Sequence, residues 1–138
     1  MKKILGILLL LLVIGGGVAY FMYNKPHTNT ATAKADFQLN AGDLFNAFQA
    51  DENASNAKYL DKVIQVKGKV QNQKLEDNGV YTIYLETSDM MGGTVSCQMA
   101  ADQAEKLTRV KKGDEVGING ICTGYLMDVV MVRCSLIE

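Results

Sequence analysis

The sequence has no tryptophan, one proline, one histidine and three cysteines among its 138 residues. A zinc site needs about four converging ligands, mostly His and Cys, and a catalytic cysteine needs a nearby base, so this composition argues against both. The formal net charge is −1 at pH 7, so the chain lacks the excess of basic residues that is typical of duplex nucleic-acid-binding proteins. Thirteen glycines suit a domain of strands joined by tight turns.

One long hydrophobic run is present. Ile4–Met22 holds 19 residues and no charged side chain. In a helix that rises about 1.5 Å per residue the run spans roughly 28 Å, close to the thickness of a bilayer core. Lys2 and Lys3 precede the run, and positive flanks stay in the cytoplasm. We therefore expect a single-pass anchor in the cytoplasmic membrane, with the N-terminus inside and the C-terminal domain extracytoplasmic.

The alternative interpretation of the same run is a cleaved signal peptide, because Gly17–Ala19 is an acceptable small-x-small cleavage site. Cleavage would release a secreted domain. The apolar run continues past this site into Tyr20, Phe21 and Tyr23, which are typical of a membrane interface and favour an uncleaved anchor. No cysteine lies near the run, so a protein anchor is expected rather than a lipid.

Composition and periodicity divide the chain into four segments: an anchor or signal peptide at 1–23, a flexible linker at 24–38, a helical segment packed on a barrel at 39–61 and the barrel at 62–138. The linker is rich in Thr, Ala and Asn and has no apolar periodicity, so its His27 is expected to be solvated. In the helical segment Leu44, Phe45 and Phe48 fall on one helical face, which is expected to pack on the barrel.

From residue 63 the apolar residues recur with a period of two, as in strands. Asn78-Gly79 is a strong hairpin signal, and Asp102 with Glu105 has the spacing of a capping box that would begin a short helix. Strands are predicted at 63–73, 81–87, 94–100, 115–124 and 128–138. The side chains expected inside the barrel are Ile64, Val66, Ile83, Leu85, Val95, Val116, Ile118, Val130 and Val132.

Three strands, a short helix and two strands resemble the order of a five-stranded Greek-key barrel, the OB-fold. The stretches "DENASNAKYLDKVIQVKGKV" and "GDEVGINGICTGYLMDVVMVRCSL", with a G-x-C-x-G…D-V…C run in the second, resemble the bacterial tRNA-anticodon-binding-like OB-fold family over roughly residues 40–137. The resemblance implies a mainly β OB-fold barrel in a small exported or membrane-anchored protein, often a lipoprotein. It brings no established activity, and this chain departs from the pattern by lacking a lipidation cysteine.

The three cysteines all fall on predicted inner faces, and the barrel segment has no histidine. We therefore predict no catalytic residue, no metal ligand and no cofactor. In an OB barrel the fifth strand lies between the third and the fourth, so Cys122 and Cys134 are expected to lie close together. They are a disulfide candidate, and buried free thiols are the open alternative.

OB barrels usually bind ligands on the faces of their first three strands. The outward residues of this region give a weak candidate site: Lys67, Lys69, Thr82, Tyr84 and Gln98. Two lysines and one tyrosine are few for a single-strand nucleic-acid binder, which combines a basic groove with several stacking aromatics, so nucleic acid is disfavoured. A solvated strand face without a ligand is the simpler alternative for Lys67 and Lys69.

The sequence thus predicts a membrane-tethered extracytoplasmic binding or scaffold module that is not an enzyme. Its ligand is unassigned, and an oligosaccharide, a peptide or an envelope protein partner would suit its polar face. A single-stranded nucleic-acid binder and an enzyme of unrecognised type are the alternatives.

Overall fold

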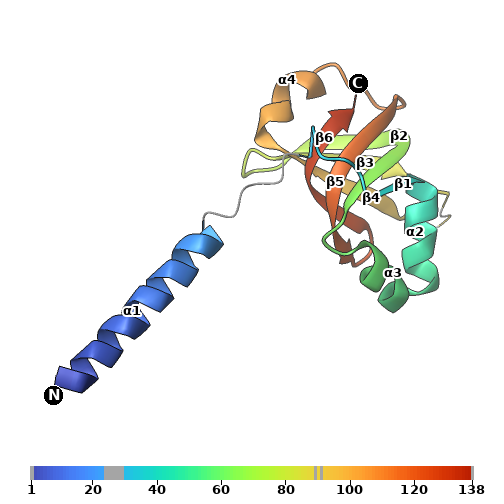
Figure 1. Ribbon diagram of the computed structural model, residues 1–138. Coiled ribbons are helices and arrows are strands. Elements are labelled where there is room, and N and C mark those ends of the chain that lie inside the picture. Colours follow the sequence, from blue (N-terminus) through green and yellow to red (C-terminus); the bar gives the residue numbers. More distant parts are fainter. Residues whose placement is uncertain (1, 24–29, 89, 91, 138) are drawn as a thin grey trace.

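The computed structural model describes residues 2–23, 30–88, 90 and 92–137 (Figure 1). The helices are α1 (Lys2–Tyr23), α2 (Ala41–Ala50), α3 (Glu52–Tyr59) and α4 (Ala104–Leu107), with a 3-10 turn, η1 (Ala101–Gln103), before α4. The strands are β1 (Phe37–Asn40), β2 (Val63–Leu75), β3 (Tyr81–Glu86), β4 (Thr94–Met99), β5 (Glu115–Tyr125) and β6 (Val129–Ile137). Within the described part of the chain, no helix combines the length and the apolar character that crossing a membrane requires.

Strands β2 to β6 form a closed barrel, as the sequence predicted. Their spatial order is β2-β3-β4-β6-β5, and β5 returns to pair with β2. The first half of β2 pairs with β5, and its second half pairs with β3, so one long strand serves both neighbours. All pairs are antiparallel except β4 with β6. The short helix lies between the third and fourth barrel strands, where an OB-fold carries its helix.

Strand β1 is a sixth strand that the sequence did not predict. It pairs in parallel with the first half of β2, from Phe37 opposite Ile64 to Asn40 opposite Lys67. The linker predicted at 24–38 therefore extends too far into the folded domain. The first half of β2 has a free edge on the side away from β5, and β1 satisfies the backbone groups along that edge. His27 lies outside the described residues.

Thr30 also belongs to the folded domain, although it falls within the predicted linker. It is only 2% exposed. Its hydroxyl contacts the Arg133 carbonyl and lies 3.0 Å from the Ser135 hydroxyl, while its carbonyl accepts from Asn119 Nδ2 at 3.2 Å. This polar cluster fixes the segment before β1 on the outside of β5 and β6.

The barrel interior agrees with most of the predicted alternation. Ile64, Val66, Ile83, Leu85, Val95 and Ile118 have no exposed surface, and Val116 is half-buried against the core. The prediction was wrong for Val130 and Val132, which are only partly buried. Val129 and Met131 take the inner positions instead.

A β-bulge explains this error. Two residues of β6, Arg133 and Cys134, lie opposite the single residue Gly120 of β5. Arg133 has a positive φ of 52°, the left-handed conformation that glycine usually supplies at such a bulge. The extra residue reverses the alternation, so odd-numbered residues point inward before the bulge and Cys134 points inward after it.

Helix α2 packs on the barrel through Leu44, Phe45 and Phe48, each at most 1% exposed. The Phe48 ring stacks on Tyr125 of β5 with centroids 5.9 Å apart. Helix α3 follows directly, and the Asp51 side chain caps it by accepting from the backbone N–H of Ala54 at 3.0 Å. These aromatic contacts fix the helices against one end of the barrel.

The short helix α4 begins differently from the prediction. Neither η1 nor α4 has a side-chain cap, so the expected capping box between Asp102 and Glu105 is absent. The helix instead begins with the 3-10 turn η1, in which backbone groups form the first hydrogen bonds. Leu107 and Val110 are buried against the barrel core.

Candidate ligand-binding face

The strand register brings together six side chains that we call the β3–β4 face. Thr82 of β3 lies between Lys74 of β2 and Gln98 of β4, and Tyr84 lies between Asn72 of β2 and Ser96 of β4. These residues alternate with the buried Ile83 and Leu85, so they share the outer surface of the barrel.

Three of the five predicted ligand-binding residues belong to this face. Tyr84 is half-buried and Gln98 is exposed, so both can contact a ligand. Thr82 was predicted to be an outward contact residue, but it is only 3% exposed. Its cross-strand neighbours Lys74 and Gln98 are long side chains on the same face, and a short side chain between them has little access to solvent.

Lys67 and Lys69 do not join the β3–β4 face. They lie on the first half of β2, opposite Gly117 and Glu115 of β5. The coiling of β2 turns this half toward another side of the barrel. Lys67 instead lines a shallow pocket of about 250 Å³ with polar residues of β1 and α2, including Asn40 and Asp43.

Lys74 was missed by the sequence analysis, and a bulge in β2 explains why. Val70 pairs with Leu85 and Asn72 with Tyr84, which leaves Gln71 as an extra residue. The inward side of β2 is even-numbered before this residue, whereas Asn72 and Lys74 point outward after it. A strict period of two places Lys74 inside, and the predicted strand also ended one residue before it, at Gln73.

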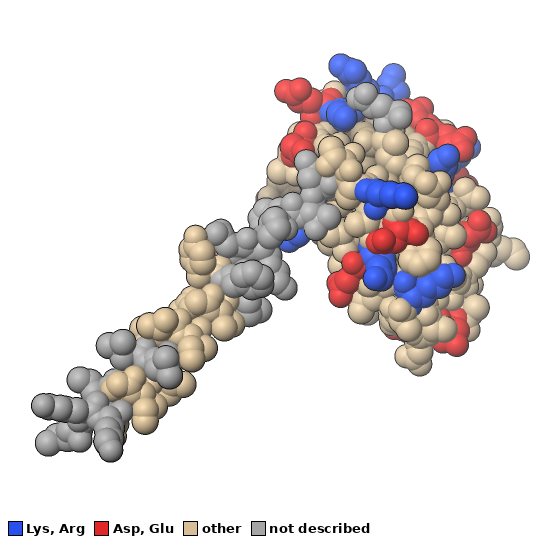
Figure 2. All heavy atoms as spheres, in the orientation of Figure 1, with Lys and Arg blue, Asp and Glu red and all other residues tan. Residues whose placement is uncertain are grey.

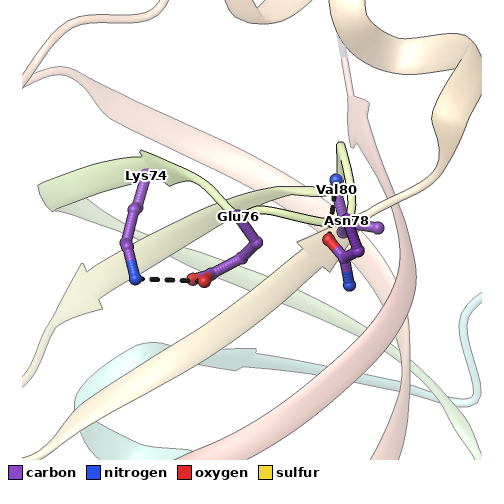
Figure 3. Close-up of polar contacts among 4 residues, drawn as sticks. All are labelled: Lys74, Glu76, Asn78 and Val80. Carbon is purple, nitrogen blue, oxygen red and sulfur yellow. Dashed lines mark hydrogen bonds and ion pairs between the residues drawn. The ribbon is translucent and has the colours of Figure 1, made fainter.

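The β2–β3 turn holds Lys74 in place (Figure 3). Lys74 Nζ lies 3.0 Å from Glu76 Oε2, and the hydrogen bond and the charge of Glu76 raise the pKa of Lys74. Beyond it, Asn78 Oδ1 accepts from the Val80 backbone N–H at 3.0 Å, and Gly79 takes a φ of 81°. The lysine charge on this face is therefore matched by a neighbouring carboxylate.

The surface charges show a similar balance. Figure 2 shows blue and red side chains interspersed over the visible side of the barrel, with no large area of one sign. Among the described residues, no group of three or more His, Cys, Asp or Glu side chains could hold a metal ion.

The three cysteines are buried free thiols. Burial raises the pKa of Cys122, and it raises the pKa of Cys134 well above the usual range, with a hydrogen bond to Cys97 adding to the second effect. The predicted pair, Cys122 with Cys134, is not bonded. Because of the β6 bulge Cys122 lies opposite Met131, and Cys134 has the Cys97 thiol of β4 as its partner.

A closed five-stranded barrel with a helix between its third and fourth strands defines the OB-fold. The model of the tRNA_anti-like family matches residues 1–136, and the chain belongs to that family.

Solved structures with a similar fold include a protein from Klebsiella pneumoniae subsp. pneumoniae MGH 78578 described as a "putative nucleic acid-binding lipoprotein". It is 11% identical, with a TM-score of 0.61, and the match covers 83% of this chain and 100% of the other. Entamoeba histolytica asparaginyl-tRNA synthetase is 14% identical, with a TM-score of 0.42 over 60% of this chain and 22% of the synthetase. No significant match was found among curated proteins.

Proposed function

We propose that this chain is a non-catalytic binding module, tethered to the outer face of the cytoplasmic membrane by α1, whose β3–β4 face binds a neutral, polar oligosaccharide. The observation that carries the proposal is the alignment of Tyr84, Lys74 and Gln98 on adjacent strands. OB barrels use this face for oligosaccharides as well as for oligonucleotides.

The tether is supported by the sequence of α1. Ile4–Met22 is uncharged, and side chains such as Leu11 and Leu12 are 64% and 71% exposed in the isolated chain. Apolar side chains on all sides of a helix favour an apolar surrounding. Mass spectrometry of the mature N-terminus, with fractionation of membranes, tests the tether. A chain that begins at Tyr20 would support cleavage and a secreted domain instead.

A binding role without catalysis is supported by the family and by the state of the thiols. The family is one of OB-fold binding domains. Cys122 and Cys134 are buried with raised pKa values, the opposite of an activated nucleophile.

The balance of charge on the β3–β4 face favours a neutral ligand. A polyanion gains most of its affinity from uncompensated cations, whereas Lys74 is already paired with Glu76. The Tyr84 ring offers a flat apolar surface for one sugar ring, and the amides of Asn72 and Gln98 offer donors and acceptors for hydroxyl groups.

Single-stranded nucleic acid is the second candidate. The description of the Klebsiella protein with a similar fold favours it, as does the presence of one aromatic and one cationic side chain on the same face. An enzyme of unrecognised type has no comparable support.

A direct titration separates the two ligands. Full-length protein in detergent micelles is titrated with chitotetraose and with a ten-nucleotide oligothymidine, each at two salt concentrations. We expect chitotetraose to bind with little dependence on salt, and Tyr84→Ala to weaken it, while Lys58→Gln on α3, outside this face, serves as the control. Salt-sensitive binding of the oligothymidine alone would support the nucleic-acid alternative and reject the oligosaccharide.

A further inference from the structure

A second concave site lies away from the β3–β4 face, where α3 meets the end of the β5–β6 hairpin; Figure 1 shows these elements side by side. This α3–hairpin groove has a volume of about 490 Å³. It is lined by Glu52, Asn56, Leu60, Thr123, Gly124, Tyr125, Leu126 and Val130.

One polar atom in the groove is buried without a partner. Among the described residues, Asn56 Oδ1 has no hydrogen-bond donor, although its surface is covered. Its neighbour across the groove is Gly124, where an added Cβ would lie 3.9 Å away. Buried acceptors in folded proteins are nearly always satisfied, so the Asn56 amide is a group that a ligand donor would satisfy once the side chain turns toward the groove.

Other side chains of the groove supply further acceptors. The Glu52 carboxylate forms no ion pair with any described residue. Thr123 donates its hydroxyl hydrogen to the Val130 carbonyl at 3.1 Å, which leaves only its lone pairs for a ligand. Lys58 of the same helix lies over the rings of Phe37 and Tyr59 at 5.6 and 4.9 Å. The groove therefore offers acceptors and one unmatched negative charge.

Apolar side chains border these acceptors. Leu126 and Met127 at the hairpin tip are 86% and 84% exposed, and Leu60 is 40% exposed. The Tyr125 ring is held in position by Phe45 and Phe48, so the wall of the groove is rigid. Exposed apolar side chains bordered by polar groups are typical of a site that binds another protein.

We propose that the α3–hairpin groove binds a lysine or arginine side chain, with its apolar neighbours, from an extended segment of a partner protein. The cationic group satisfies Glu52 and Asn56 Oδ1, and the partner's apolar residues cover Leu60 and Leu126. An anionic membrane surface is a poorer occupant, because a carboxylate and a set of acceptors would face phosphate groups.

The test uses full-length protein in detergent micelles and two fluorescent peptides of equal apolar content, acetyl-Leu-Lys-Leu-Arg-Leu-amide and acetyl-Leu-Glu-Leu-Glu-Leu-amide. We expect fluorescence anisotropy to show binding of the cationic peptide only. Glu52→Gln should weaken this binding about two- to fivefold, the range of a solvent-accessible charge pair. Asn56→Asp should tighten it by a similar factor, and Glu105→Gln on α4 should leave it unchanged.

Each contrary result overturns the proposal. Equal binding of the two peptides would show that only apolar contact is involved. Unchanged affinity in both Glu52→Gln and Asn56→Asp would place the peptide elsewhere. Absence of peptide binding would reject the proposal, and in that case self-association or vesicle binding that Leu126→Ser abolishes would identify a second copy or a lipid surface as the occupant.

Discussion

The Cys134 thiol lies directly over the α-carbon of Gly120, so closely that a Cβ added to the glycine would be 2.5 Å from the sulfur. This contact joins β5 to β6 at the bulge and leaves no room for any larger residue. Gly120→Ala should lower the free energy of unfolding by about 1–3 kcal/mol, the usual cost of overpacking a core.

Urea denaturation measures this cost. Removing the sulfur in Cys134→Ala should recover part of the loss when the two substitutions are combined, since contacting residues are not additive. Simple additivity of the two effects would show that the thiol is not what excludes the methyl group.

The second prediction concerns the oxidation state of the cysteines. Because all three are buried free thiols, native protein should react slowly with a thiol reagent, and denatured protein should show three thiols without a reductant. A count of one thiol before reduction and three after it would show that two of the cysteines form a disulfide, and peptide mapping would then tell Cys122–Cys134 from a bond that includes Cys97. Assay of protein isolated from an oxidising compartment gives the sharpest result.

The third prediction follows from the pKa of Cys134. Burial raises this pKa well above the ordinary value of 9.0, so above pH 9 the unfolded chain loses a proton that the folded chain retains. The contribution of the buried thiol to stability is complete below pH 9 and is lost as the pH rises toward the folded pKa.

Urea titrations between pH 7 and pH 10.5 test this linkage. We expect the free energy of unfolding to fall above pH 9 with a slope that approaches about 1.4 kcal/mol per pH unit for this group. Cys134→Ala should have a shallower slope than the parent protein. Parallel pH profiles for the two proteins would contradict the prediction.

The fourth prediction concerns the backbone of Arg133, whose φ of 52° suits glycine. Arg133→Gly should change the free energy of unfolding by less than about 1 kcal/mol, because relief of strain offsets the greater freedom of the unfolded chain. Arg133→Val should cost at least about 1–2 kcal/mol, since β-branched residues rarely adopt this conformation. Equal stability of the two variants would mean that the bulge is absent in solution.

Much of the barrel follows from local pattern. The period of two in Ile64–Val66 and Ile83–Leu85, together with the Asn78-Gly79 turn, sufficed to place the first hairpin. The errors cluster where one extra residue enters a strand. The bulges at Gln71 and Arg133 reverse the alternation, and neither position carries the glycine that would signal a bulge.

The candidate site was harder to predict than the core, because it depends on which strands are neighbours. The register places Thr82, Tyr84 and Gln98 on one face of the barrel, whereas the coiling of β2 separates Lys67 and Lys69 from them. The α3–hairpin groove joins residues about 70 positions apart and includes an unpaired amide oxygen, a property of three-dimensional packing alone.

The contacts of Thr30 with β5 and β6 set the length of the linker between α1 and the barrel. Only residues 24–29 separate Tyr23 from Thr30, and seven peptide steps reach at most about 25 Å when fully extended. If α1 is held in a bilayer, as proposed above, the domain is confined to a thin layer next to the membrane. A ligand or partner must come within that layer, which raises the local concentration of anything else attached to the same surface.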